Sequence, residues 1–142
     1  MTNANELRIG NVIWDDVCNE LHGNGLVKIK SLSETTAHYI SLIKSDFGKF
    51  NSGVSYINAK GVLITPEILE KCGFERQNYG WTINKLNESD DSCFCLFDMN
   101  YNSGDLLLEL NAAYCPCPKV EHLHQLQNLY FALCGEELNY TP

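Results

Sequence analysis

The sequence has little positive charge. Its 142 residues include 10 lysines and arginines against 18 aspartates and glutamates, which gives a formal net charge of −8. This charge opposes attraction to the phosphate backbone of nucleic acids and to anionic lipid. The basic residues are scattered along the chain and form no cluster beside the aromatic ones. We therefore predict no general nucleic-acid binding.

Long apolar runs and targeting segments are lacking as well. No run approaches the roughly 18 apolar residues that would indicate a helix spanning a bilayer. Residues 1–6 carry neither the basic segment nor the apolar stretch of a signal peptide. We expect a cytoplasmic protein with no membrane partner, and its seven cysteines are expected to be reduced thiols.

Familiar catalytic signatures are missing too. The sequence contains no Gly-x-Ser-x-Gly nucleophile motif, no GxxxxGK[ST] phosphate loop and no Cys-x-x-Cys redox pair. We expect no cofactor, and a protein without catalytic activity is favoured over an enzyme.

The pattern of the chain predicts an α+β protein with two abutting halves, residues 1–64 and 65–142. About five short strands separated by glycine-containing turns predict a small SH3-like β-barrel in the first half. In the second half, Thr65 and Pro66 indicate the start of a short helix that ends at Gly73. Two hairpins are expected next, with strands at residues 74–77, 81–86, 93–99 and 106–112. Residues 120–134 have the spacing of an amphipathic helix, which we expect to pack on the second sheet.

Cysteine and histidine provide the candidate metal ligands. Cys93 and Cys95 lie two apart on a predicted strand, and Cys115 and Cys117 lie two apart in a loop. Two residues spaced in this way on a strand share a face, so a zinc site is conceivable. Zinc knuckles place at least two residues between paired ligands, which favours small buried hydrophobes for the first pair and exposed thiols for the second.

Two histidines follow these cysteines. His122 and His124 flank Leu123, so we predict that they point to different sides of the helix. The spacing lacks the i, i+4 pair that a helical metal site favours, and a polar helix face is the simpler interpretation.

Aromatic residues are the best candidates for binding. They make up 11% of the chain, and several lie at expected turns, where tyrosine offers contact area at a low entropic cost. If a ligand binds, we expect it where the two halves meet, because pockets favour such junctions. The candidate ligand-binding residues are Trp14, Tyr39, Tyr79 and Trp81.

Three stretches resemble a known family. They are residues 5–11 (NELRIGN), residues 64–74 with their Thr-Pro-Glu start and Cys-Gly-Phe end, and residues 124–138 (HQLQNLYFALCGEEL). They are similar to a family of small uncharacterised proteins from Bacteroides-type gut bacteria and their phages and mobile elements. Cys134 differs from the threonine expected there, and the loop with Cys115 and Cys117 is not typical of the family. The resemblance implies a bacterial host cell, but it brings no catalytic residue.

Two functions of different class follow from these patterns. The first is a non-catalytic binding protein of a phage or mobile element that captures a host protein or a small nucleotide signal, with host-defence modulation as one result. The alternative is a small zinc- or thiol-dependent enzyme that uses the Cys/His cluster at residues 93–124. An acidic DNA mimic is a weaker third hypothesis, and the sequence leaves a homo-oligomer open.

Overall fold

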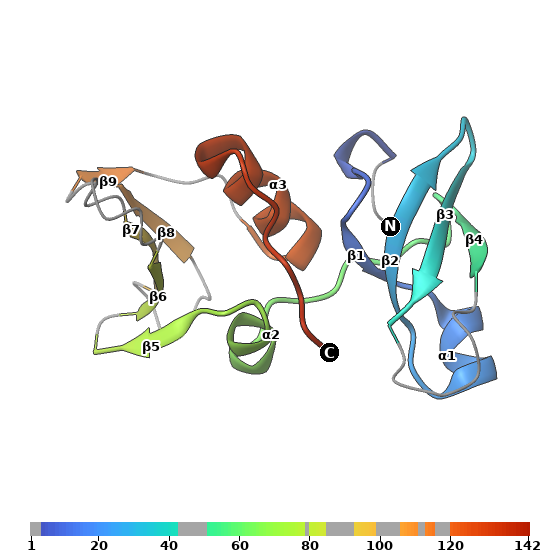
Figure 1. Ribbon diagram of the computed structural model, residues 1–142, viewed down its shortest axis with the longest axis horizontal. Coiled ribbons are helices and arrows are strands. Elements are labelled where there is room, and N and C mark those ends of the chain that lie inside the picture. Colours follow the sequence, from blue (N-terminus) through green and yellow to red (C-terminus); the bar gives the residue numbers. More distant parts are fainter. Residues whose placement is uncertain are drawn as a thin grey trace. The chain divides into compact units, whose positions relative to one another are not determined.

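A computed structural model describes residues 4–42, 51–78, 80–84, 93–98, 106–110, 113–115 and 120–142 of an α+β protein (Figure 1). The chain forms two compact units. Unit 1 consists of Met1–Ile64 together with Glu121–Pro142, and unit 2 is Thr65–Val120. Unit 2 is therefore an insertion within unit 1.

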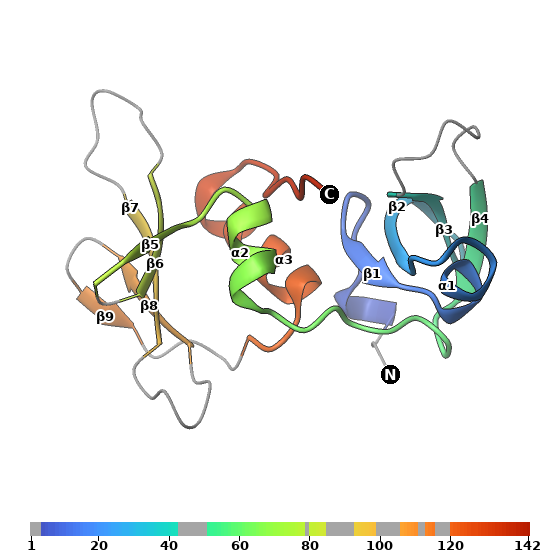
Figure 2. The same cartoon turned by 90° about the horizontal axis from the view of Figure 1, so that it is seen from below.

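Unit 1 contains a four-stranded antiparallel sheet in the order β1-β2-β3-β4 (Figure 2). Its strands are β1 (Val12–Trp14), β2 (Leu26–Leu32), β3 (Thr36–Ser41) and β4 (Asn51–Ser55). The sequence predicts a closed barrel, whereas β1 and β4 lie at opposite edges of this sheet and do not pair in the described part of the chain. Short strands can bury one face without closing the sheet when other elements cover it.

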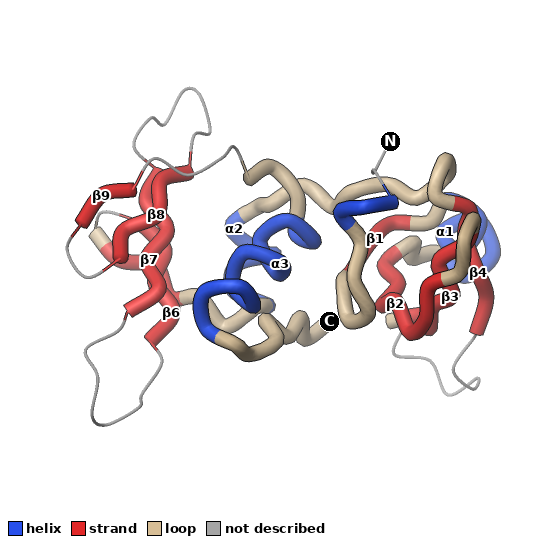
Figure 3. The backbone as a smooth tube through the Cα atoms, turned by 90° about the horizontal axis from the view of Figure 1, so that it is seen from above, coloured by secondary structure: helices blue, strands red, loops and turns tan. Residues whose placement is uncertain are grey.

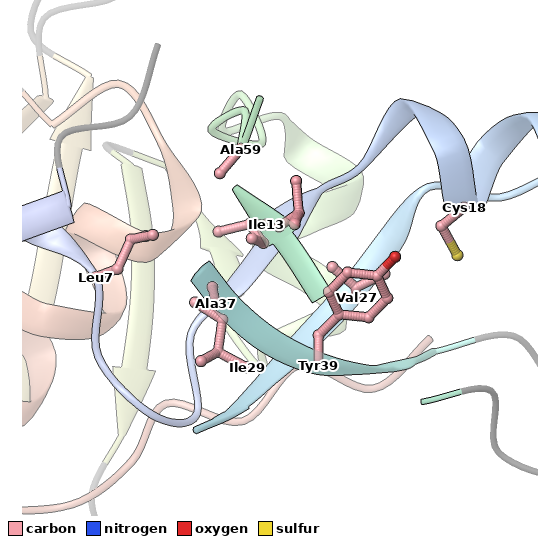
Figure 4. Packing of buried hydrophobic residues seen from close by; sticks show 9 residues of the cluster. Leu7, Ile13, Cys18, Val27, Ile29, Ala37, Tyr39 and Ala59 are labelled. Carbon is pink, nitrogen blue, oxygen red and sulfur yellow. The ribbon is translucent and has the colours of Figure 1, made fainter. Parts of the chain in front are cut away.

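The core of unit 1 follows the alternation of its strands. Val27 and Ile29 on β2 are fully buried, as the alternating pattern of residues 26–32 predicts. Ala37 and Tyr39 contribute the same face of β3. Figure 4 shows these side chains packed together, with the Tyr39 hydroxyl on the side of the sulfur of Cys18.

Two short helical elements lie next to these strands in the sequence. The 3-10 turn η1 (Ala4–Glu6) precedes β1, and helix α1 (Asp16–His22) lies between β1 and β2. Asp15 caps α1 by accepting a hydrogen bond from the Val17 N–H at 3.2 Å. Gly23 ends the helix in the left-handed conformation, with φ of 73°. The turn signal at residues 22–25 is visible in the sequence, but a helix of seven residues has too little periodicity to be predicted.

Unit 2 contains helix α2 and a five-stranded antiparallel sheet in the order β5-β6-β7-β8-β9 (Figure 3). Helix α2 (Pro66–Lys71) begins as predicted, because Thr65 Oγ1 accepts the Ile68 N–H at 3.3 Å. Both predicted hairpins are confirmed, and one further strand extends the sheet. The strands are β5 (Glu75–Gln77), β6 (Gly80–Asn84), β7 (Cys93–Asp98), β8 (Leu106–Leu110) and β9 (Ala113–Cys115).

The last helix, α3 (Leu123–Cys134), belongs to unit 1. Its Gln127 side chain accepts the Val12 N–H of β1 at 2.9 Å. The sequence predicts this helix on the second sheet, within residues 65–142. The difference arises because the outgoing and returning chains pair: Leu123 N–H donates to Val62 C=O at 2.8 Å, and Ile64 N–H donates to Glu121 C=O at 3.0 Å.

Candidate functional site

The predicted ligand-binding residues are distributed over both units. Trp14 ends β1 and is half-buried, whereas Tyr39 lies in the core of unit 1. Trp81 is half-buried in β6 of unit 2, in register with Arg76 on β5. Tyr79 lies outside the described residues. A common surface formed by these four residues stays a prediction.

Tyr39 connects the sheet to α1. Its hydroxyl donates a hydrogen bond to Asp15 Oδ2, and both residues are almost fully buried, at 2% and 3% exposure. Burial and then the hydrogen bond to Asp15 raise the pKa of Tyr39 well above its usual value. The hydroxyl is therefore a permanent donor at physiological pH, and it stabilises the residue that caps α1.

Trp14 is held in one orientation at the surface. Its indole Nε1 donates to Asp16 Oδ1 at 3.0 Å, and the Asp16 carboxylate also pairs with Lys60 Nζ. These two bonds, Lys60 first, lower the pKa of Asp16. The ring system also lies close to Gly25, where a Cβ would lie 2.6 Å from Trp14 Cε2. Gly25 thus permits the close approach that positions the indole.

Helix α1 has an unusual distribution of side chains. It buries the small Cys18 completely, whereas Val17 and Leu21 are 58% and 64% exposed. These two apolar residues are four positions apart and therefore lie on one face of the helix. Asp16 and Glu20, also four apart, are exposed beside them. We call the set Trp14, Asp16, Val17, Glu20 and Leu21 the α1 surface.

The charge at the α1 surface is negative. Asp16 and Glu20 are its acidic residues, and Asp16 forms an ion pair with Lys60. Because Lys60 is paired with Asp16, its ammonium group is not free to bind an anion at this surface. The electrostatic field here favours cationic groups over anionic ones.

Cys18 and Cys72 are poor nucleophiles. Burial raises the pKa of Cys18 above its usual value and raises the pKa of Cys72 to about 12. Because the thiolate is the reactive form, both cysteines are protonated and unreactive at physiological pH. They behave as small buried hydrophobes.

The four cysteines proposed as zinc ligands are only partly described. Cys93 and Cys95 lie in β7 and Cys115 lies in β9, while Cys117 is outside the described residues. Cys95 pairs with Glu109 on β8, whereas Cys115 pairs with the neighbouring Leu108, so the two cysteines occupy different rows of the sheet. Within the described ranges, no group of three or more His, Cys, Asp or Glu side chains could hold a metal ion. The four-cysteine site stays a prediction.

The two histidines near α3 lie together. The sequence predicts that His122 and His124 point to different sides of the helix, but their rings stack with centroids 5.7 Å apart. The prediction is wrong because His122 is the N-cap residue, with an extended backbone (φ −122°, ψ 148°), and lies outside the helical geometry. His124 Nε2 is 3.5 Å from Glu6 Oε2, and His124 Nδ1 is buried without a partner. Burial lowers the pKa of His124, so its imidazole is neutral at physiological pH.

Residues from the two ends of the chain, within 5–11 and 124–138, lie together in unit 1. Arg8 Nη2 is 2.8 Å from Glu137 Oε1, and the Arg8 guanidinium lies 3.9 Å above the ring of Phe131. Asn11 Nδ2 donates to Asn128 Oδ1 at 3.0 Å. These bonds fix the first residues of the chain against α3. Both stretches therefore have a structural role that their separation in the sequence hides.

Some of the residues described above carry no clear signal in the sequence. Asn11 and Gln127 are fully buried polar residues, and nothing in the helix and strand periodicity distinguishes them from surface positions. Val17 and Leu21 have the i, i+4 spacing of a buried helix face, so the pattern alone would predict the wrong environment for them.

Comparison with protein-family models, curated proteins and solved structures finds no match for this chain. None of the described helices has the length and apolar character needed to cross a membrane.

Proposed function

We propose that this chain is a non-catalytic binding protein of a phage or mobile element that captures a host protein or a small nucleotide signal, with modulation of host defence as one outcome. The observation that carries the proposal is the α1 surface, where a helix buries a cysteine and exposes its valine and leucine. Exposing a large apolar side chain forgoes roughly 1.5–3 kcal/mol of burial energy. A binding partner that covers Val17 and Leu21 would recover this energy.

The polar side chains of unit 1 support a binding role over catalysis. Asp15 and Tyr39 are bonded to each other in the core, and Cys18 is a buried thiol with a raised pKa. Each of these groups stabilises the fold, and none of them combines exposure with the shifted pKa of a nucleophile or general base. A cytoplasmic location and an SH3-like topology of unit 1 belong to the same proposal.

Affinity capture tests the proposal. The tagged chain is incubated with a lysate of a Bacteroides-type bacterium, and bound proteins and small molecules are quantified by mass spectrometry. We expect one dominant partner or ligand, retained in stoichiometric amount. A chain that retains nothing above an unrelated acidic protein of equal charge would contradict the proposal.

Elemental analysis of the same purified protein tests the alternative. Near-stoichiometric zinc would favour the small enzyme built on the Cys/His cluster at residues 93–124. Zinc well below stoichiometry would remove the metal-dependent form of that hypothesis.

A further inference from the structure

The α1 surface has a chemistry that selects among partners. Val17 and Leu21 are separated by one helical turn, which places them about 6 Å apart along the axis. Asp16 and Glu20 have the same spacing beside them. The indole of Trp14 is connected to this helix by its hydrogen bond to Asp16. The surface thus offers two apolar side chains next to two carboxylates, of which Asp16 is paired with Lys60.

We infer that the captured partner is a protein, and that a segment of it rich in both basic and apolar residues docks on the α1 surface. This inference rests on the binding function proposed above and specifies its partner. Apolar side chains of the segment cover Val17 and Leu21, and its lysines or arginines approach Glu20 and the exposed edge of Asp16. Complementary charge of this kind accelerates association and fixes the register of a docked segment.

The same chemistry disfavours a nucleotide at this position. Phosphate groups need cationic side chains or free backbone N–H groups. Among the described residues, Lys60 at the α1 surface is already paired with Asp16, and the Val17 N–H is bonded to Asp15. A phosphate placed here would also face the carboxylate of Glu20. A nucleotide therefore loses the electrostatic contribution that a basic protein segment gains.

A second copy of this chain is a poor occupant for the same reason. Another copy of this chain carries the same formal net charge of −8. Two copies would also bring their acidic α1 surfaces or other acidic regions together, at an electrostatic cost. The partner is therefore a different protein.

Matched leucine variants test the docking surface. Leu21→Glu replaces an exposed apolar residue in the α1 surface. Leu32→Glu makes the same change at the last residue of β2, about 20 Å along that strand from its first residue. Both positions are exposed, so both variants should fold, which thermal unfolding verifies. We expect Leu21→Glu to reduce partner capture about tenfold or more, as at an interface hot spot. Leu32→Glu should capture as much partner as the unmodified chain.

Charge reversal and cross-linking identify the chemistry of the partner. Glu20→Lys should weaken capture several-fold, and raising the salt from about 50 to about 500 mM should weaken binding to the unmodified chain. A photoreactive residue at position 21 should cross-link to a peptide that contains lysine or arginine beside apolar residues, and one at position 32 should not.

The outcomes separate this inference from the function on which it rests. A partner captured equally by the unmodified chain and Leu21→Glu would overturn the inference and leave the binding function standing. Retention of a nucleotide as the sole ligand would likewise overturn the inference and leave the binding function standing. Failure of the unmodified chain to retain any partner would contradict both.

Discussion

At the scale of single residues, the Tyr39 hydroxyl and the Asp15 carboxylate determine how α1 is attached to the sheet. Asp15 accepts from the Val17 N–H and from Tyr39, so one buried side chain both caps the helix and binds β3. A buried acceptor that loses its donor costs about 1–3 kcal/mol. The stability of α1 therefore depends on a residue in a distant strand.

Tyr39→Phe should lower the free energy of unfolding by about 1–3 kcal/mol, because it leaves one Asp15 oxygen buried without its donor. Tyr56→Phe is the matched control, since the Tyr56 hydroxyl donates to Ser33 C=O at an exposed position. Urea unfolding followed by tryptophan fluorescence measures both. An equal loss in the two variants would contradict the role of the buried pair.

His124 predicts how stability changes with pH. Burial lowers its pKa in the folded chain, whereas the unfolded chain has a histidine pKa of about 6.5. The unfolded state therefore binds more protons as the pH falls below about 6.5, and stability should decrease in that range until the pH reaches the lower folded-state pKa. Glu6 is the opposing charge, and His122 adds to the lowering.

Urea unfolding measured between about pH 7.5 and about pH 5 tests this dependence. His124→Gln should reduce the loss of stability over this interval. His38→Gln, at an exposed position of β3, should preserve it. An unchanged pH profile for His124→Gln would show that another group is responsible.

At the scale of elements, the helices show what the sequence can predict. Helix α2 follows directly from the Thr-Pro-Glu start, because capping is a local interaction. The predicted helix at residues 120–134 agrees with α3 apart from its first turn. Its packing partner could not be predicted, because residues 12 and 127, which share a hydrogen bond, are 115 positions apart in the sequence. The α1 surface was equally hidden, since a helix of seven residues has too little periodicity to be predicted.

Gln127 is the residue that connects α3 to its neighbours. Its Oε1 accepts from the Val12 N–H, and its Nε2 donates to Leu138 C=O at 3.1 Å. Gln127→Ala leaves both backbone groups buried without partners and should cost at least about 2 kcal/mol of unfolding free energy. Gln125→Ala, on the same helix, removes an exposed capping acceptor and should cost about 0.5–2 kcal/mol. A larger loss for Gln125→Ala in urea unfolding would contradict this account of α3.

At the scale of the whole molecule, the chain is one unit with a second unit inserted into it. The insertion leaves unit 1 after Ile64 and returns at Glu121, where the two backbones share a hydrogen bond of 3.0 Å. A short loop can therefore close unit 1 at little entropic cost. The division predicted from the sequence, residues 1–64 and 65–142, has the first boundary between the units but lacks the second, at Glu121. The second boundary could not be predicted, because the return of the chain to unit 1 is visible only in the hydrogen bond between Leu123 and Val62.

Replacement of residues 65–120 by a short glycine-serine linker should leave unit 1 folded. We expect cooperative thermal unfolding and protected backbone amides in β2 and β3. Removal of residues 121–142 is the control, and it should abolish cooperative unfolding because Gln127 and Asn128 of α3 bond to Val12 and Asn11 at the start of the sheet. An unfolded linker variant would show that unit 1 depends on the insertion.

The central claim is that unit 1 uses the α1 surface to bind another protein. Quantitative capture by the unmodified chain, Leu21→Glu and Leu32→Glu from one lysate tests it most directly. The account predicts a dominant protein partner that is reduced about tenfold by Leu21→Glu and unaffected by Leu32→Glu. Equal capture by all three chains would contradict it.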